Sequence, residues 1–167
     1  MIDPTLLSDG FSVRRLNEND MDDICSLCVE NTTYYAHLRK TPSRELISDD
    51  MTALPRGKSP ADKYFLGFFD GGTLIAVMDL IDGYPDDTTA YIGFFMMRTD
   101  RQHRGIGTAI IAEVCEKLAS FGFCEVKLAY VDTNTQAKRF WEKCGFIPDG
   151  KQGDNDGVPI TELCKRI

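Results

Sequence analysis

Hydrophobic and polar residues along this chain are arranged in a way that predicts strands. Residues 11–16 (FSVRRL) alternate as a half-buried strand does, and two apolar runs, 63–69 (KYFLGFF) and 73–81 (TLIAVMDLI), flank an Asp-Gly-Gly turn typical of a hairpin. Residues 90–97 (AYIGFFMM) are nearly all apolar, as expected of a strand buried on both faces. These segments predict the first four strands of one sheet.

Apolar residues at helical spacing occupy the segments between and after these strands. They predict four helices, over residues 20–38, 43–53, 106–121 and 134–144. Three further strands are predicted at 124–131, 146–151 and 158–167. The sequence therefore predicts an α/β fold, an α+β mixed sheet of about seven strands with four helices.

Length and charge narrow the class of protein. The 167 residues predict a single domain over 1–167, with residues 1–10 as an N-terminal extension. A formal charge of -7 argues against a broad basic surface, and therefore against binding to nucleic acid or to an anionic membrane. No apolar run is long enough to span a membrane, and the first residues lack the pattern of a signal peptide. We therefore expect a cytoplasmic protein.

The six cysteines predict neither a metal site nor disulfides. Cys25 and Cys28 have the spacing of half a zinc site, but no second pair and no histidine cluster completes it. Cys28 instead continues the apolar stripe of Met21 and Ile24, as a small core residue does. Reduced thiols in a cytoplasm fit this pattern.

A cationic, glycine-rich segment, residues 101–107 (RQHRGIG), joins a buried strand to the start of a helix. Free amides and the helix dipole at such an end attract an anion, and Gly105 and Gly107 allow a phosphate to reach the backbone. Arg101 and Arg104 can add charge-assisted bonds. The alternative is a surface loop whose arginines only solubilise it, and the spacing favours phosphate binding.

Two common nucleotide-binding motifs do not fit this segment. Ile110 stands where a dinucleotide-binding fingerprint needs its third glycine, and too few strands follow for a doubly wound domain. No Gly-Lys-Ser/Thr is present, which excludes a Walker loop. A nicotinamide-dependent enzyme is therefore nearly excluded.

Two motifs resemble those of the GNAT N-acetyltransferase superfamily. Residues 102–107 (QHRGIG) match its Q/R-x-x-G-x-G/A signature, placed between the fourth strand and the third helix, and residues 134–146 (NTQAKRFWEKCGF) are similar to its second signature. The order of elements matches from about residue 11 to the C-terminus. The resemblance implies a GNAT-like acyl-CoA N-acyltransferase fold, with a V-shaped splay between the fourth and fifth strands.

Acetyl-CoA is the co-substrate that the resemblance implies, with no metal. Its pyrophosphate would lie on the amides of residues 102–107 and its pantetheine arm along the end of the fourth strand. The cofactor-binding residues expected are Met96, Met97, Arg98, Arg101, Gln102, His103, Arg104, Gly105, Ile106, Gly107, Thr108, Asn134, Phe140 and Trp141. Asn134 can equally be a plain helix cap, and Phe140 also lies on the apolar face of its helix.

The sequence departs from the family pattern at the groups that move protons. Many members carry a Glu on the fourth strand and a Tyr on the last helix, but TAYIGFFMM has no acid and Trp141 takes the Tyr position. The catalytic candidates are Asp79, Tyr91 and Tyr130, with the backbone N–H of Met97 aimed at the thioester oxygen. Tyr91 and Tyr130 are equally explained as sheet residues. Asp79 interrupts an apolar strand and needs a partner.

The acceptor is expected across the splay, between residues 31–38 and 82–87. Tyr34, Tyr35 and Asp79 are the candidate substrate residues, and acidic groups nearby favour a cationic acceptor, a small-molecule amine or a peptide amine. A solvated acidic loop is the equal alternative for those acidic groups.

These observations predict an N-acetyltransferase that moves an acetyl group from acetyl-CoA to a primary amine by direct transfer in a ternary complex. The missing Glu and Tyr leave an alternative open, an acyl-CoA-binding sensor or accessory module with little turnover. A homodimer is compatible with either function.

Overall fold

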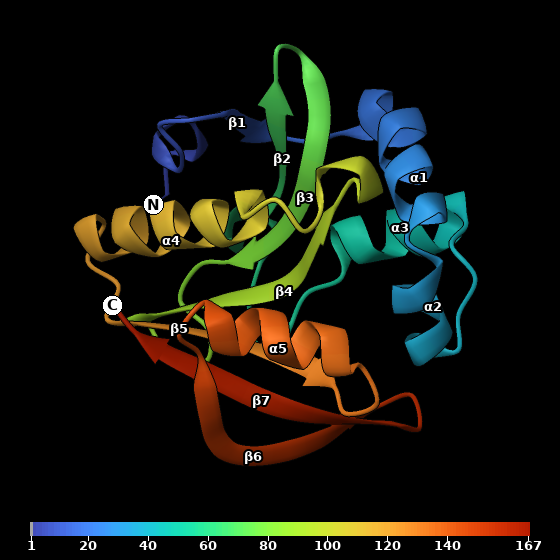
Figure 1. Cartoon of the computed structure of the whole chain (residues 1–167). Helices are drawn as coiled ribbons and strands as arrows, with labels where there is room; N and C mark the ends of the chain where they lie inside the picture. Colours follow the sequence, from blue (N-terminus) through green and yellow to red (C-terminus); the bar gives the residue numbers. More distant parts are fainter. Residues whose placement is uncertain (1) are drawn as a thin grey trace.

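The computed structural model describes residues 2–167 and has one seven-stranded sheet with helices on both faces (Figure 1). The strands are β1 (Ser12–Arg15), β2 (Lys63–Asp70), β3 (Thr73–Ile81), β4 (Thr89–Met97), β5 (Glu125–Val131), β6 (Ile147–Asn155) and β7 (Val158–Arg166). The α-helices are α1 (Met21–Glu30), α2 (Thr32–Leu38), α3 (Arg44–Thr52), α4 (Ile106–Ser120) and α5 (Thr135–Lys143). The strand order is β1-β2-β3-β4-β5-β7-β6, with β4 and β5 parallel and all other neighbours antiparallel. The predicted mixed α/β fold is confirmed.

The described chain has five α-helices rather than the four predicted, because the segment expected as one helix over 20–38 is divided in two. Asn31 separates α1 from α2 with φ −91° and ψ 52°, outside the helical region. Its side chain fixes the break, since Nδ2 donates to Leu27 O at 2.8 Å and to Met97 O at 2.9 Å. Apolar spacing does not reveal this bond, which joins a polar side chain to a strand distant in sequence.

β4 and β5 pair only over their first residues. The register joins residues 89–92 to residues 125–128 and then stops. Gly93 is left out of the β3–β4 ladder as a bulge, because Ile92 and Phe94 pair with consecutive residues of β3. A bulge bends a strand and increases its twist, so the end of β4 diverges from β5. The predicted splay between the fourth and fifth strands is confirmed and begins at Gly93.

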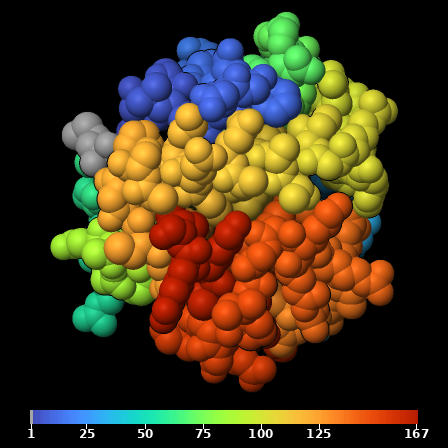
Figure 2. All heavy atoms as spheres, turned by 60° about the vertical axis from the view of Figure 1, so that its left-hand side comes forward, coloured from blue at the N-terminus to red at the C-terminus, as the bar shows by residue number. Residues whose placement is uncertain are grey.

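Two hydrophobic cores lie on opposite faces of the sheet. On one, which we call the α1–α3 face, lie α1, α2 and α3 (Figure 1). Their core residues pack against Phe65, Val77 and Met96 of the sheet. On the other, the α4–α5 face, α4 and α5 pack together with N-terminal residues, and Figure 2 shows α4 between the N-terminal segment and the C-terminal strand β7. Successive strand residues alternate between faces, so Phe94 belongs to the α1–α3 core and Phe95 to the α4–α5 core.

The β6–β7 hairpin is longer than the strands predicted for it. β6 continues to Asn155, and the turn is Asp156 and Gly157, both with positive φ, as a tight two-residue hairpin requires. Lys40 Nζ, from the loop after α2, lies 3.1 Å from an Asp156 oxygen. The tip of the hairpin therefore reaches the α1–α3 side of the molecule.

Candidate active site

The segment between β4 and α4 presents backbone N–H groups at its surface. After the 3-10 turn η4 (Thr99–Arg101), His103 and Gly105 have left-handed backbone angles, with φ of 59° and 80°. Gly105 is the N-cap of α4, and the amides of residues 106–108 have no carbonyl within the helix to bond. A Cβ at Gly105 would meet no atom within 4 Å. This geometry is that of an open anion-binding helix end.

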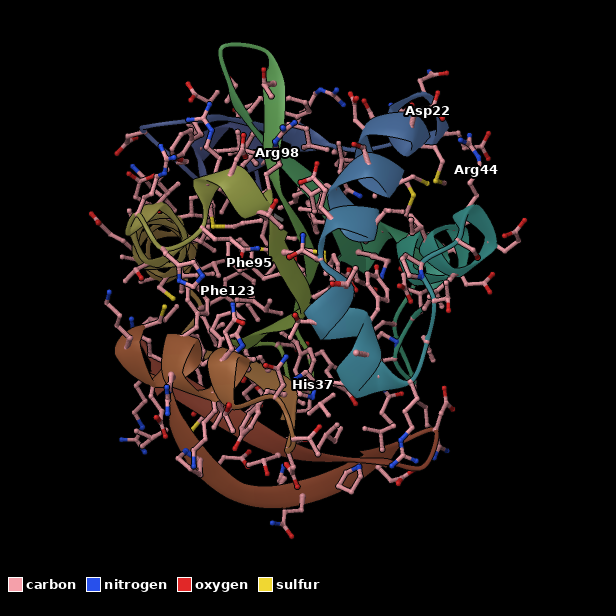
Figure 3. All side chains as sticks on the ribbon, turned by 45° about the vertical axis from the view of Figure 1, so that its right-hand side comes forward. Asp22, His37, Arg44, Phe95, Arg98 and Phe123 are labelled. Carbon is pink, nitrogen blue, oxygen red and sulfur yellow. The ribbon has the colours of Figure 1, made fainter. Side chains whose placement is uncertain are left out.

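The arginines of this region differ in what they already contact. Arg98 Nε lies 3.2 Å from an Asp100 oxygen, and Arg101 Nη1 lies 3.1 Å from an oxygen of Asp70. Figure 3 labels Arg98 just beyond the end of β4. Arg104 is exposed, and no ion pair joins it to another residue of the described chain. Arg104 is therefore the arginine whose charge is free for a ligand.

Gln102, expected to bind the cofactor, bonds inside the protein. Its Nε2 donates to Asn31 Oδ1 at 2.8 Å and to Met97 O at 3.0 Å, and its backbone N–H donates to Thr99 O at 3.3 Å. Met97 O also accepts the bond from Asn31, so one carbonyl at the end of β4 holds both the loop and the break between α1 and α2. In this structure Gln102 holds the loop in place.

The end of β4 turns two amides toward the splay. Arg98 N–H donates to Ile75 O of β3 at 2.9 Å. Because successive N–H groups of an antiparallel strand point alternately to its two sides, those of Met97 and Phe95 face away from β3. This is the side from which β5 has diverged. The Met97 N–H, predicted to face the thioester oxygen, thus points into the splay, whereas the Met96 side chain packs on the α1–α3 face.

Gly107 packs tightly between β4 and α5. A Cβ at this position would lie 2.7 Å from Met97 Sδ and 3.2 Å from a ring carbon of Phe140, closer than side chains pack. Its neighbours in the first turn of α4, Ile106 and Thr108, are partly buried. Packing therefore requires the glycine at 107, in addition to any contact with a ligand.

Trp141 lies within an aromatic cluster on the α4–α5 face. Its ring centroid is 4.9 Å from Phe140, 6.1 Å from Phe95 and 5.3 Å from Phe146, and only 7% of the residue is exposed. Phe140 is partly buried and stacks on Phe95 with centroids 5.8 Å apart. Figure 3 labels Phe95 on the side of β4 that faces α4. Trp141 is a core residue in this structure.

Asn134 caps α5. Its Oδ1 accepts the N–H of Ala137 at 2.9 Å, which bears out the interpretation as a helix cap. No hydrogen bond from its Nδ2 to another described residue is present, although the residue is 7% exposed. The capping role uses the oxygen and leaves the NH2 group able to donate to a ligand.

A cavity of about 170 Å³ opens on the α1–α3 face beside the bulge at Gly93. Its lining residues are Tyr34, Tyr35, Leu38, Lys40, Leu46, Asp50, Ala53, Asp79, Gly93, Phe94 and Asn155. The structure thus brings together the three residues predicted for the acceptor, Tyr34, Tyr35 and Asp79. The loop 82–87, expected as a second wall, does not line this cavity.

Two tyrosines give the cavity a neutral polar wall. The Tyr34 ring stands edge-on to Phe94 with centroids 5.5 Å apart, and it is 5.2 Å from Tyr35. Burial raises the pKa of both tyrosines, so their hydroxyls keep their protons at neutral pH. The Tyr35 hydroxyl is buried and has no hydrogen-bond partner among residues 2–167.

Asp79 and Asp50 bring two carboxylates to the cavity. Asp79 Oδ2 accepts a bond from Lys63 Nζ at 2.8 Å, and the Lys63 side chain is only 5% exposed. Burial raises the pKa of Asp79, and the bond and charge of Lys63 partly oppose the rise. Burial likewise raises the pKa of Asp50, against the opposing charges of Lys40 and Lys63.

Tyr91 and Tyr130 lie away from this cavity. Tyr91 precedes the bulge and packs edge-on to Tyr84 with centroids 5.5 Å apart, and burial raises its pKa. Tyr130 packs against the core of the α4–α5 face. Both positions agree with the interpretation as sheet residues. Of the three side chains predicted to handle protons, Asp79 is the one that lines the cavity.

Sequence reasoning missed Lys63, Asp50 and Asn155. Lys63 is diagonal to Asp79 across the β2–β3 pair, since Phe65 is directly opposite Asp79. A signal for Lys63 exists, because a buried acid on one strand needs a cation on its neighbour. Asp50 lies on α3 and Asn155 at a hairpin tip, and local pattern alone does not place either one beside β4.

Residues 2–167 contain neither a cluster of potential metal ligands nor a helix that could cross a membrane. No group of three or more His, Cys, Asp or Glu that could hold a metal occurs within residues 2–167. The six cysteines are free. Over the same residues, no helix combines the length and the apolar character needed to cross a membrane.

Comparisons with known proteins agree with this geometry. A sequence model described as the Acetyltransferase (GNAT) family matches residues 27–146. No curated protein matches the chain in sequence.

Solved structures share the fold. An acetyltransferase from Thermus thermophilus has a TM-score of 0.73 at 19% identity, over 94% of this chain and 97% of that one. Spermidine N-acetyltransferase from Vibrio cholerae, in complex with CoA and spermine, has a TM-score of 0.69 at 15% identity, over 95% and 96%. AAC(6')-Ib, in complex with ribostamycin and coenzyme A, has a TM-score of 0.73 at 14% identity, over 95% and 94%. At these identities the likeness establishes the fold alone.

Proposed function

We propose that this protein moves the acetyl group of acetyl-CoA directly to a primary amine held in the cavity beside Gly93. The chain belongs to the acetyltransferase (GNAT) family and is therefore an N-acetyltransferase. The observation that carries this proposal is the meeting of two unlike sites at one point of β4. Donors for an anion lie toward the α4–α5 face, and a cavity with two carboxylates lies on the α1–α3 face. A ternary complex would place donor and acceptor on either side of the splay, without a covalent enzyme intermediate.

The residues toward the α4–α5 face fit the parts of acetyl-CoA. The outward amides of residues 106–108 and the free guanidinium of Arg104 suit phosphate groups. The N–H groups of Met97 and Phe95 point into the splay, where an extended pantetheine arm with its own amides could pair with the strand edge. The Nδ2 of Asn134 adds a further donor. Acetyl-CoA supplies the acetyl group as a thioester, whose thiol is a good leaving group.

The acceptor is proposed to be a cationic amine. Asp50 and Asp79 line the cavity, and Asp50 has no ion-pair partner within 4 Å in the described chain, so an ammonium group would relieve its burial. Aromatic faces of Tyr34 and Phe94 also suit a cation. Two structures of the same fold hold spermine and ribostamycin, which supports amines as the ligand class. Family membership does not favour the alternative of an acyl-CoA-binding module with little turnover.

The test is a screen for CoA release. The protein is incubated with acetyl-CoA and one of a panel of amines, comprising alkylamines, diamines, amino sugars, a peptide with a free N-terminus, and hydroxylamine. Free thiol is followed with a thiol reagent, and the acetylated product is identified by mass. We expect release that requires both protein and amine and is fastest for cationic amines. Binding of acetyl-CoA without amine-dependent release across the whole panel would overturn the proposal in favour of a binding module.

A further inference from the structure

Asp79 occupies a position where a carboxylate is costly. It lies toward the end of β3, between Met78 and Leu80, which are both fully buried. Its strand partner is Phe94, the residue directly after the bulge at Gly93. An ionised group in such surroundings destabilises the fold unless it is paired, and even a paired one is seldom better for stability than an apolar residue. Stability therefore does not explain a carboxylate at residue 79, and a role in function does.

Gly93 keeps the carboxylate of Asp79 uncovered. A Cβ at residue 93 would lie 2.7 Å from Asp79 Oδ2 and 3.4 Å from its Cγ. Gly93 is not among the glycines with positive φ, so its backbone conformation is open to other residues. Gly93 is also exposed and lines the cavity. The absence of a side chain here leaves Oδ2 of Asp79 uncovered at the point where β4 leaves β5.

Lys63 holds the carboxylate from the opposite side. Its Nζ lies 2.8 Å from Asp79 Oδ2, while Asp79 Oδ1 is buried without a hydrogen-bond partner among residues 2–167. Oδ2 is thus held by a buried cation on one side and faces the open position at Gly93 on the other, and it keeps a further lone pair that can accept a proton. The other titratable groups that line the cavity are Tyr34 and Tyr35 from α2, Lys40 from the loop after α2, and Asp50 from α3.

We infer that Asp79 is the general base for the transfer, taking a proton from the acceptor amine, and that Lys63 and Gly93 are positioning residues for its carboxylate. This inference rests on the proposed function. The fourth strand, β4, carries no acidic residue. Asp79 on the neighbouring strand β3 supplies the carboxylate instead, and it is reached across the bulge at Gly93. Burial raises the pKa of Asp79, which makes the carboxylate a stronger base than a free one, and the bond and charge of Lys63 oppose the rise.

An ammonium acceptor loses two protons from nitrogen on becoming an amide. The first passes to the Asp79 carboxylate, directly or through one water, and then to solvent, leaving the nitrogen lone pair free. This pair forms the C–N bond at the thioester carbonyl carbon, and the C–S bond then breaks with its electrons on sulfur. The second proton leaves the nitrogen of the tetrahedral intermediate, and the thiolate takes up a proton to give CoASH.

The test compares two nucleophiles that differ in their need for a base. An alkylammonium must lose a proton before it attacks, whereas hydroxylamine is already neutral at neutral pH. Asp79→Asn should lower kcat with the best alkylamine by roughly 10²- to 10⁴-fold, the usual contribution of a general base. With hydroxylamine the loss should be less than about tenfold. An equal loss with both nucleophiles, or no loss with the alkylamine, would overturn the assignment of Asp79.

Two further variants keep the test decisive if Asp79→Asn folds poorly, because that change leaves Lys63 buried and unpaired. The double variant Lys63→Gln with Asp79→Asn removes both charges and should show the same selective loss with the alkylamine. Gly93→Ala pushes on the carboxylate without any change in charge, and it should lower kcat for the alkylamine more than for hydroxylamine. Thermal unfolding and acetyl-CoA affinity are measured for each variant to confirm that it is folded and binds the donor.

A pH profile separates positioning by Lys63 from a merely structural role. The rate should rise with pH as Asp79 loses its proton, and the Lys63 cation lowers the pKa of that step. Lys63→Gln should therefore move the acidic limb of kcat/KM to higher pH for the alkylamine; an unmoved limb would overturn the role of Lys63.

If no amine in the panel, hydroxylamine included, releases CoA, the proposed function fails and this inference falls with it. Transfer to both nucleophiles with no selectivity in Asp79→Asn would leave the function standing and overturn the base alone.

Discussion

The two faces of this enzyme that meet at the splay are built by different means. Toward the α4–α5 face, the proposed anion-binding end is one continuous segment, residues 98–108, and its donors are mostly backbone amides. On the α1–α3 face, the cavity takes its lining from α2, α3, β3, β4 and the β6–β7 hairpin, and its chemistry comes from side chains. A site made of consecutive backbone groups can be recognised from a short motif. A site assembled from distant elements depends on the packing of the whole sheet.

The two faces also differ in how their functional residues relate to stability. The α4–α5 side carries an aromatic cluster around Trp141 that packs in the core. The cavity on the other face is lined by two carboxylates, Asp50 and Asp79, and Asp79 is paired with the buried Lys63. We therefore expect substitutions at the aromatic cluster to act first on folding, and substitutions at the acidic cavity to act first on the acceptor.

The strongest test of this contrast is Trp141→Ala. Removing a buried indole that contacts three rings leaves a large cavity, and we expect a loss of about 3–5 kcal/mol in the free energy of unfolding. Affinity for acetyl-CoA should fall as well, because Phe140 and Phe95 lose their support. Denaturant unfolding and calorimetry with acetyl-CoA measure the two effects.

Trp141→Phe is the matched control for this prediction. It keeps an aromatic ring in the cluster, so it should retain most turnover and lose less stability than the alanine variant. If Trp141→Phe lost turnover while stability and affinity stayed unchanged, the indole N–H would take part in the chemistry. Trp141 would then act in the chemistry as well as in packing, and proton transfer would not be confined to the α1–α3 face.

Arg104→Ala sharpens the comparison on the donor side. Arg104 has no ion-pair partner in the described chain, whereas Arg101 lies 3.1 Å from an Asp70 oxygen. A free guanidinium that bonds a phosphate should contribute about 1.5–3 kcal/mol to acetyl-CoA affinity, and Arg101→Ala should cost less because Asp70 already offsets its charge. Calorimetry at two salt concentrations measures both, with dephospho-CoA to identify the phosphate. A larger effect for Arg101→Ala would show that the loop rearranges on binding.

The splay between the fourth and fifth strands was expected from the resemblance to the GNAT superfamily, whereas the order of the elements and the hairpins were predicted from local signals. Apolar runs, an Asp-Gly-Gly turn and glycines after helices mark these elements wherever they occur. The division of the first predicted helix at Asn31 was not predictable in this way, because it depends on a bond from Asn31 to the carbonyl of Met97. That bond forms only when the helix already lies beside the end of β4.

The candidate site shows the same limit residue by residue. Asp79 could be singled out because a lone acid in an apolar strand is a local anomaly. Lys63, its partner, required the β2–β3 register, and Asp50 required the orientation of α3. Gln102 belongs to a recognised motif, yet its side chain bonds Asn31 and Met97. A motif therefore identifies a loop without stating which of its side chains face the ligand.

Asp50→Asn is the smallest expected effect and tests the acceptor side by charge alone. Asp50 is partly buried at the cavity, and its carboxylate should attract a cationic acceptor by about 1 kcal/mol, or roughly fivefold in KM. The effect should shrink at high salt, since partly exposed charges are screened. Burial raises the pKa of Asp50, so the advantage of the wild-type protein should vanish as pH falls through that raised pKa and the carboxylate becomes neutral.

Steady-state kinetics with a diamine and with hydroxylamine, which is neutral, measure the effect of Asp50→Asn and its control. Asp50→Asn should raise KM for the diamine with little change in kcat and leave hydroxylamine unaffected; an equal change for both would mean that Asp50 shapes the cavity and does not recognise charge.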